Sequence, residues 1–116
     1  MLELFEDITY ELTNYERERL LPILVVGLSK KIGPENAVTN KTIVDKVGRG
    51  LSGPRVRKII NVIRNEGLLP GLIASSKGYY ITRDKSELDR YIRSLEGRES
   101  AIRKVREKTR AYMLTL

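Results

Sequence analysis

The chain has 116 residues, of which 41% are hydrophobic and 32% charged, and its 22 Lys and Arg against 15 Asp and Glu leave a formal net charge of +7. This length predicts one domain with a modest core. Cysteine and histidine are both absent, which excludes disulfides, thiolate chemistry and the commonest general base and metal ligand. The composition therefore predicts a cytoplasmic, non-enzymatic protein without a cofactor, and its charge favours a polyanion as the partner.

The N-terminal stretch is acidic and carries no membrane signal. Residues 1–20 contain six acids and two bases, a net charge of −4, and we expect them to face away from a polyanion. Within an acidic lead over residues 1–12, residues 8–12 alternate apolar and polar side chains, which predicts an edge strand. The longest apolar run, residues 20–28, is far shorter than the roughly 20 residues of a bilayer span, so no membrane partner is expected.

A first helix is predicted from a capping box. Thr13 and Glu16 have the spacing at which each side chain satisfies a free amide of the other at a helix start. We expect the helix to reach about Ile32 and to stop at Gly33, with a kink at Pro22. Its apolar residues cover most of the circumference and predict a central, buried helix: Leu20, Leu21, Ile23, Leu24, Val25, Leu28 and Ile32.

A pair of helices joined by a glycine-bearing turn follows. Residues 37–39 are predicted as a short strand, and Thr39 or Asn40 as the cap of a helix that reaches about Val47. The turn covers residues 48–51. A second helix with a basic face after such a turn is typical of a helix-turn-helix.

That second helix, residues 52–66, begins at Ser52 as its cap and has Pro54 in its first turn. Its apolar stripe consists of Val56, Ile59, Ile60 and Ile63. We expect an outward, DNA-binding set made of Arg55, Arg57, Lys58, Asn61 and Arg64. Arginine and asparagine match guanine and adenine edges in the major groove, and lysine binds phosphate. A solvated helix face without a ligand is the alternative.

Residues 72–82 predict a β-hairpin. With Lys77 and Gly78 as its two-residue turn, Ala74 faces Ile81. The face expected to be buried is formed by Leu72, Ala74, Tyr79 and Ile81. This arrangement leaves Lys77 at an exposed tip.

Positive charge is concentrated between Lys41 and Arg83, where nine bases and two acids give a net charge of +7. Arg49 in the turn and Lys77 at the hairpin tip are expected to bind the phosphate backbone. The hydroxyl of Tyr80, on the other face of the hairpin, is a further candidate for a phosphate contact. Packing is the alternative for Tyr80.

Residues 85–116 predict a long C-terminal helix with a weak point at Gly97. Nine positions spaced three or four apart form a heptad seam: Leu88, Tyr91, Leu95, Arg98, Ile102, Val105, Thr109, Tyr112 and Leu116. We expect homodimerisation through its later part, at Ile102, Val105, Tyr112 and Leu116. The alternative is that the helix folds back on its own domain.

The run Gly-Pro-Arg-Val-Arg-Lys-Ile-Ile-Asn-Val-Ile-Arg (residues 53–64) and the hairpin Ile-Ala-Ser-Ser-Lys-Gly-Tyr-Tyr-Ile (73–81) resemble winged helix-turn-helix DNA-binding proteins, in particular small ones encoded by phages and prophages. The resemblance spans about residues 14–95. It implies an α+β, mainly α fold: a three-helix core with a hairpin wing over residues 13–84, then the C-terminal helix. The basic residues of helix 52–66 and Lys77 match the family's groove and wing positions.

The resemblance implies a double-stranded DNA-binding protein, acting in transcription regulation or as an accessory factor of phage replication or excision. Its helix 52–66 reads the major groove and its wing contacts the backbone. The first alternative is a winged-helix protein-interaction module without DNA binding, which has no reason to keep a +7 patch. RNA binding is disfavoured because exposed stacking aromatics are lacking. No small-molecule substrate is evident, and no nucleophile and base form a catalytic motif.

Overall fold

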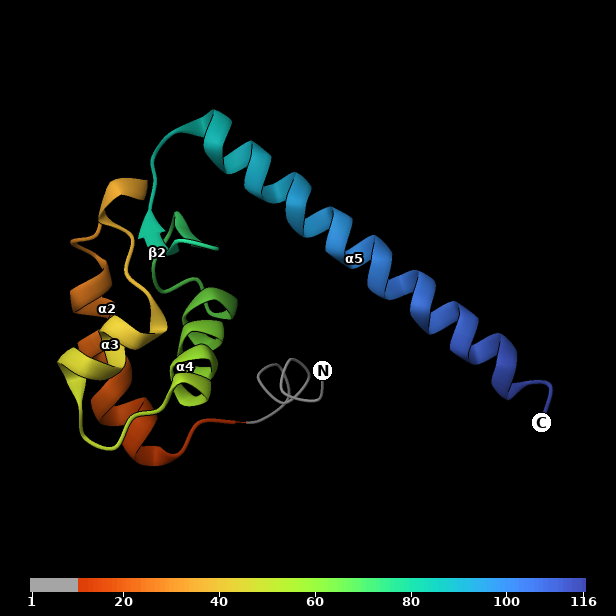
Figure 1. The fold of residues 1–116 in the computed structure, drawn as a ribbon, viewed down its shortest axis with the longest axis horizontal. Helices are drawn as coiled ribbons and strands as arrows, with labels where there is room; N and C mark the ends of the chain where they lie inside the picture. The colour runs from red at the N-terminus through yellow and green to blue at the C-terminus, as the bar shows by residue number, and fades with distance from the viewer. Residues whose placement is uncertain (1–10) are drawn as a thin grey trace. The chain divides into compact units, whose positions relative to one another are not determined.

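The computed structural model describes residues 11–116 and divides the chain into two compact units, Met1–Thr82 and Arg83–Leu116. The protein is mainly helical, with a small two-stranded antiparallel sheet (Figure 1). The elements of the first unit are η1 (Glu16–Leu20), α2 (Leu21–Leu28), η2 (Pro34–Asn36), α3 (Asn40–Val47), α4 (Gly53–Asn65), β1 (Leu72–Ser75) and β2 (Gly78–Ile81), and the second unit is the helix α5 (Lys85–Met113). The predicted edge strand lies mostly outside the described residues, and residues 11–12 have no regular structure.

The first helix begins as predicted. The amide of Glu16 donates to Thr13 Oγ1 at 3.1 Å and the amide of Thr13 donates to Glu16 Oε1 at 2.8 Å, which is the reciprocal capping box. Near the position of the predicted kink the structure has a π-helical turn, η1, which ends two residues before Pro22. In it the amide of Leu21 bonds to the carbonyl of Glu16, five residues earlier. The wider turn accommodates a proline ring that has no amide to donate.

The predicted end of this helix at Ile32 is wrong, because α2 ends at Leu28. The following backbone is used by the sheet instead. The amide of Ile81 donates to the carbonyl of Lys31 at 2.7 Å, and the amide of Gly33 donates to the carbonyl of Ile81 at 2.8 Å. Backbone groups that bond to a strand edge are no longer available to a helix.

The helix is also less buried than predicted. Its buried apolar residues are Leu20, Leu21, Leu24 and Leu28, whereas Ile23 is 38% exposed; Ile32, which lies beyond the end of the helix, is 45% exposed. The buried set recurs at intervals of three and four, so one face packs on the core and the opposite face is open. The core that this face joins is formed with α4 and the hairpin.

The next two helices match their predicted limits closely. Thr39 caps α3, since its Oγ1 accepts from the amide of Thr42 at 3.2 Å, and Ser52 caps α4, accepting from the amide of Arg55 at 3.4 Å. The predicted stripe of α4 forms the centre of the core, where Val56, Ile59, Ile60 and Ile63 are each at most 1% exposed. Caps and periodic apolar residues are local signals, which is why they predicted these helices correctly.

The hairpin forms, but its register differs from the prediction. Ala74 pairs with Tyr79 and Ser75 with Gly78, so residues 76–77 are the turn. The pairing has moved by two residues, which keeps the same side chains on each face. Gly78 explains the shift: its φ is +118°, and a Cβ there would lie 2.3 Å from the carbonyl oxygen of Val38. This glycine is therefore needed inside the strand.

The predicted strand at residues 37–39 is an isolated bridge on the free edge of β2. Val38 and Tyr79 exchange backbone hydrogen bonds of 3.0 and 2.8 Å. The Tyr79 hydroxyl also donates to Asn40 Oδ1 at 2.7 Å. These contacts connect the hairpin to the start of α3, so the sheet and the helices of the first unit form one core.

In the second unit, α5 is continuous over 29 residues and passes through Gly97 without a break. Asp84 caps it, accepting from the amide of Ser86 at 2.9 Å. Two ion pairs at i,i+4 spacing, Asp89–Arg93 at 3.1 Å and Glu99–Arg103 at 3.3 Å, lie along its surface. Such pairs stabilise a solvent-exposed helix by small increments.

Candidate nucleic-acid interface

Three of the predicted α4 residues lie together on one side of the helix, outside the core stripe. Arg57, Asn61 and Arg64 are spaced four and three apart and are partly exposed. Arg64 Nη1 donates to Asn61 Oδ1 at 3.5 Å. This contact holds two polar side chains next to each other on one turn of the helix.

Arg55 is predicted to point outward, and its side chain is 30% exposed, but it has a partner within the protein. Its guanidinium forms an ion pair with the carboxylate of Glu16, whose side chain is only 8% exposed. This pairing, and the hydrogen bonds to Thr13, hold the pKa of Glu16 below its ordinary value. The spacing of Arg55 on its own helix carried no information about a partner 39 residues away. Arg55 therefore ties α4 to the first helix.

Lys58 is also less accessible than predicted, because only 6% of the residue is exposed. It shares a helix side with Arg57 and Asn61 by its spacing. A lysine stem is apolar over four carbons and packs readily when covered. The prediction from periodicity thus gave the correct side of the helix but the wrong exposure.

The acidic stretch before α2 does not simply face away from the basic helix, as the charge pattern predicted. Glu16 pairs with Arg55, and Arg17 pairs with Glu66 at the end of α4 at 3.1 Å. The first pair neutralises one cation of the 41–83 segment, and the second neutralises one acid of the same segment. The net charge of the segment therefore stays at +7. The sequence predicted only a capping role for Glu16. The signal for a cationic partner was its carboxylate in the first turn of the first helix.

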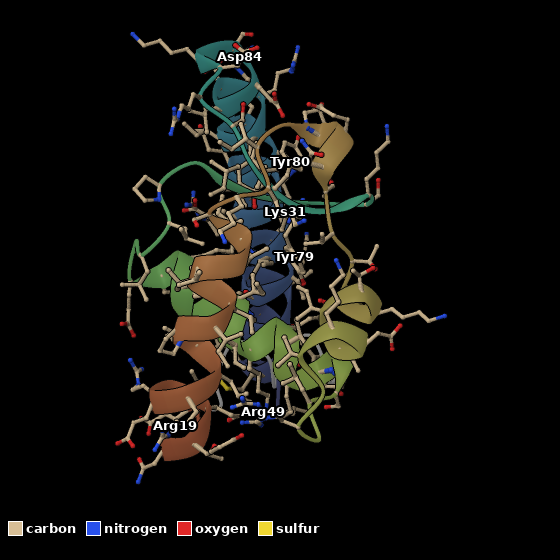
Figure 2. The ribbon with its side chains drawn as sticks, turned by 90° about the vertical axis from the view of Figure 1, so that its left-hand side faces the viewer. Arg19, Lys31, Arg49, Tyr79, Tyr80 and Asp84 are labelled. Atoms are coloured by element: carbon tan, nitrogen blue, oxygen red, sulfur yellow. The ribbon has the colours of Figure 1, made fainter. Side chains whose placement is uncertain are left out.

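Arg49 lies in the turn between α3 and α4 and is exposed. It has a φ of +56° between two glycines that also have positive φ, Gly48 and Gly50. A non-glycine residue in this region is strained, and such strain is often found at functional sites. Figure 2 shows Arg49 at the end of the first unit that lies away from Tyr80.

Of the two hairpin residues predicted to contact phosphate, Lys77 and Tyr80, only Lys77 is exposed. Lys77 is exposed in the turn, where its amide donates to Ser75 Oγ at 3.2 Å while that hydroxyl donates to the carbonyl of Gly78 at 3.0 Å. Tyr80 is only 7% exposed, as is expected of a packing residue. The two labelled tyrosines, Tyr79 and Tyr80, lie along the same strand in Figure 2.

All four residues of the predicted dimer contact are exposed, three of them on α5 and Leu116 beyond its end. The exposed fractions are 60% for Ile102, 66% for Val105, 66% for Tyr112 and 90% for Leu116. None of the residues of α5 is buried. The second unit by itself therefore leaves its apolar seam uncovered.

Across residues 11–116 no group of three or more metal-ligating side chains gathers. None of the helices in this part of the chain combines the length and apolar character needed to cross a bilayer. Comparison with models of protein families, with curated proteins and with solved structures finds no match for the chain. The arrangement of the residues themselves carries the functional argument.

Proposed function

We propose that the chain is a winged helix-turn-helix protein that binds double-stranded DNA, inserting α4 into the major groove and placing the hairpin on the sugar-phosphate backbone. The observation that carries this proposal is the joint placement of the partly exposed Arg57, Asn61 and Arg64 on one side of α4, outside its core stripe. Arginine and asparagine are the side chains that read guanine and adenine by paired hydrogen bonds. Of the three, Arg57 lies nearest the start of α4, where such helices contact base edges.

The surroundings of α4 support the same reading. Arg49 precedes the helix in an exposed turn and Lys77 occupies an exposed hairpin tip. Side chains in such positions bind phosphates and orient the protein on the duplex without reading sequence. Arg17 neutralises Glu66, which is the only acid within or directly after α4, and so lowers repulsion of a polyanion.

A protein-interaction module is the second candidate. It is favoured by the ion pair of Arg55 with Glu16, which neutralises one cation, and by the low exposure of Lys58, which buries another. The two functions differ in salt dependence. If about five phosphates are contacted, the logarithm of the DNA affinity falls against the logarithm of salt concentration with a slope of about −4 to −5, whereas a module without DNA binding has no such slope.

Fluorescence anisotropy on duplexes at several salt concentrations, with sites selected from a random pool, tests the proposal. Arg57→Ala is expected to lose about 1 to 3 kcal/mol on the selected site and to relax base preference, because it removes a base contact. Lys77→Ala is expected to weaken all duplexes alike and to reduce the salt slope by about 1, because it removes a phosphate contact. Lys30→Ala, which removes an exposed cation outside the 41–83 segment, is the charge-matched control. Unchanged affinity and preference in Arg57→Ala would refute the assignment of α4.

A further inference from the structure

The apolar seam of α5 needs a partner. Ile102, Val105 and Tyr112 are each at least 60% exposed and recur at spacings of three and seven. An exposed apolar line of this kind on a long helix marks a contact with another helix. The charges beside the seam distinguish between the possible partner orientations.

We propose that two copies of the chain pair through α5 as an antiparallel coiled coil, in which Ile102 of one copy packs beside Val105 of the other. This inference deepens the proposed function, because it defines how two DNA-binding units are connected. In the same register Leu95 packs beside the partner's Tyr112. Seam positions of opposite kind, a and d, share each layer of an antiparallel coil.

The seam contains one charged residue, Arg98, and its position disfavours a parallel pair. In a parallel coil in register each seam residue faces its own copy, so two Arg98 guanidinium groups would meet in the core. Like charges in a desolvated contact are costly. In the antiparallel register Arg98 faces Thr109 of the partner, a neutral residue whose hydroxyl accepts a hydrogen bond.

The residues beside the seam also favour the antiparallel pair. Glu99 and Arg106 both occupy the e position of the heptad, and e positions face each other only in an antiparallel coil. The register above places Glu99 of each copy opposite Arg106 of the other, so two reciprocal ion pairs between the copies replace the contacts that Glu99 makes to Arg103 and Arg106 makes to Glu107 within one helix. In a parallel coil Glu99 would face Ser94 of the partner, and Arg106 would face Ala101 of the partner. Neither residue would then form an ion pair between the two copies.

The distribution of charge along α5 gives a third argument. Residues 100–116 contain five bases and one acid, a net charge of +4, whereas residues 85–99 contain four bases and four acids. A parallel pair would align two +4 segments along their full length. In the antiparallel register above, residues 100–116 lie against residues 91–107 of the partner, which contain five bases and three acids, a net charge of +2, so the repulsion is reduced.

The surface of the helix is hollowed on the same side. A shallow hollow on α5 is lined by Leu95, Arg98, Glu99, Ile102, Arg103 and Arg106. The first four of these are spaced at 0, 3, 4 and 7. This is the spacing of the four-residue hole into which a seam residue of a partner helix inserts.

The orientation has a consequence for DNA. The dyad falls between residues 103 and 104, so the two Lys85 residues at the starts of α5 are separated by about 55 Å, at roughly 1.5 Å per residue. Two DNA-binding units related by this dyad are expected to read an inverted repeat whose half-site centres are separated by whole duplex turns of about 34 Å.

Cysteine cross-linking of the full chain tests the orientation, since the natural sequence has no cysteine. Leu95→Cys and Tyr112→Cys are prepared separately, oxidised with copper phenanthroline alone and as a mixture, and analysed on a non-reducing gel. The antiparallel pair predicts a disulfide-linked dimer only in the mixture. Two copies of residue 95 would lie about 25 Å apart, beyond the roughly 7 Å that a disulfide bridges.

Each outcome decides the proposal. A linked dimer from either variant alone would show a parallel pair and overturn the inference, and so would the lack of any linked dimer in the mixture. Anisotropy of the same unoxidised variants on DNA separates this result from the proposed function, because cross-linking without DNA binding would refute only the latter. As a second readout, Glu99→Arg is expected to raise the dimer dissociation constant about tenfold, and Arg106→Glu in the same chain to restore it.

Discussion

Replacing Gly78 with alanine is expected to destabilise the first unit because the residue has no room for a Cβ. At its φ of +118° the added atom would lie 2.3 Å from the carbonyl oxygen and 2.5 Å from the carbonyl carbon of Val38. The backbone conformation alone costs about 1 to 3 kcal/mol for a non-glycine residue. The added Cβ also pushes the backbone at Gly78 away from that at Val38, which weakens the two hydrogen bonds between Val38 and Tyr79. Each of these hydrogen bonds contributes about 0.5 to 1.5 kcal/mol.

Together these effects predict a loss of about 2 to 5 kcal/mol in the free energy of unfolding, which is a large part of the stability of a small domain. Urea denaturation followed by circular dichroism measures the loss. The same variant is expected to weaken binding to all duplexes, because Lys77 is the neighbouring residue in the turn and moves with Gly78. The strand then no longer holds the hairpin tip in place.

Two other glycines provide matched controls. Gly50→Ala also places alanine at a positive φ, +74°, but meets no atom within 4 Å, so it is expected to cost only about 1 kcal/mol. Gly97→Ala lies in the open on α5 and is expected to stabilise that helix by about 0.5 to 1 kcal/mol. If Gly78→Ala costs no more than Gly50→Ala, the close approach to Val38 does not determine the hairpin register.

Glu16→Gln is expected to lower stability at neutral pH by about 2 kcal/mol, because it leaves Arg55 without its carboxylate partner, while glutamine still completes the capping box with Thr13. Since the folded-state pKa of Glu16 lies below its ordinary value of 4.5, its contribution is present above that pH and is lost as the pH falls through the folded-state pKa. The difference between variant and parent in urea should therefore shrink in acid, and a constant difference from pH 7 to pH 3 would contradict the ion-pair assignment. Arg49→Gly relieves a positive φ of +56°, so we expect a gain of up to about 1 kcal/mol in thermal denaturation together with weaker binding to all duplexes by anisotropy; a loss of stability would assign Arg49 to the fold instead.

The sequence alone determined the parts of this protein that depend on neighbouring residues. The capping box at Thr13, the caps at Thr39 and Ser52 and the apolar stripe of α4 were predicted correctly. Each follows from interactions within one or two helical turns. The helical nature of residues 85–113 and the presence of the hairpin were predicted for the same reason.

Only the tertiary structure decided the features that join distant segments. The end of α2 at Leu28 depends on the pairing of residues 31–33 with β2, and the hairpin register depends on the approach of Gly78 to Val38. The role of Arg55 depends on Glu16, a residue of another helix. A helical period predicts the direction of a side chain but not the residue that it contacts. A contact between residues about 40 apart in the sequence forms only when the whole core folds.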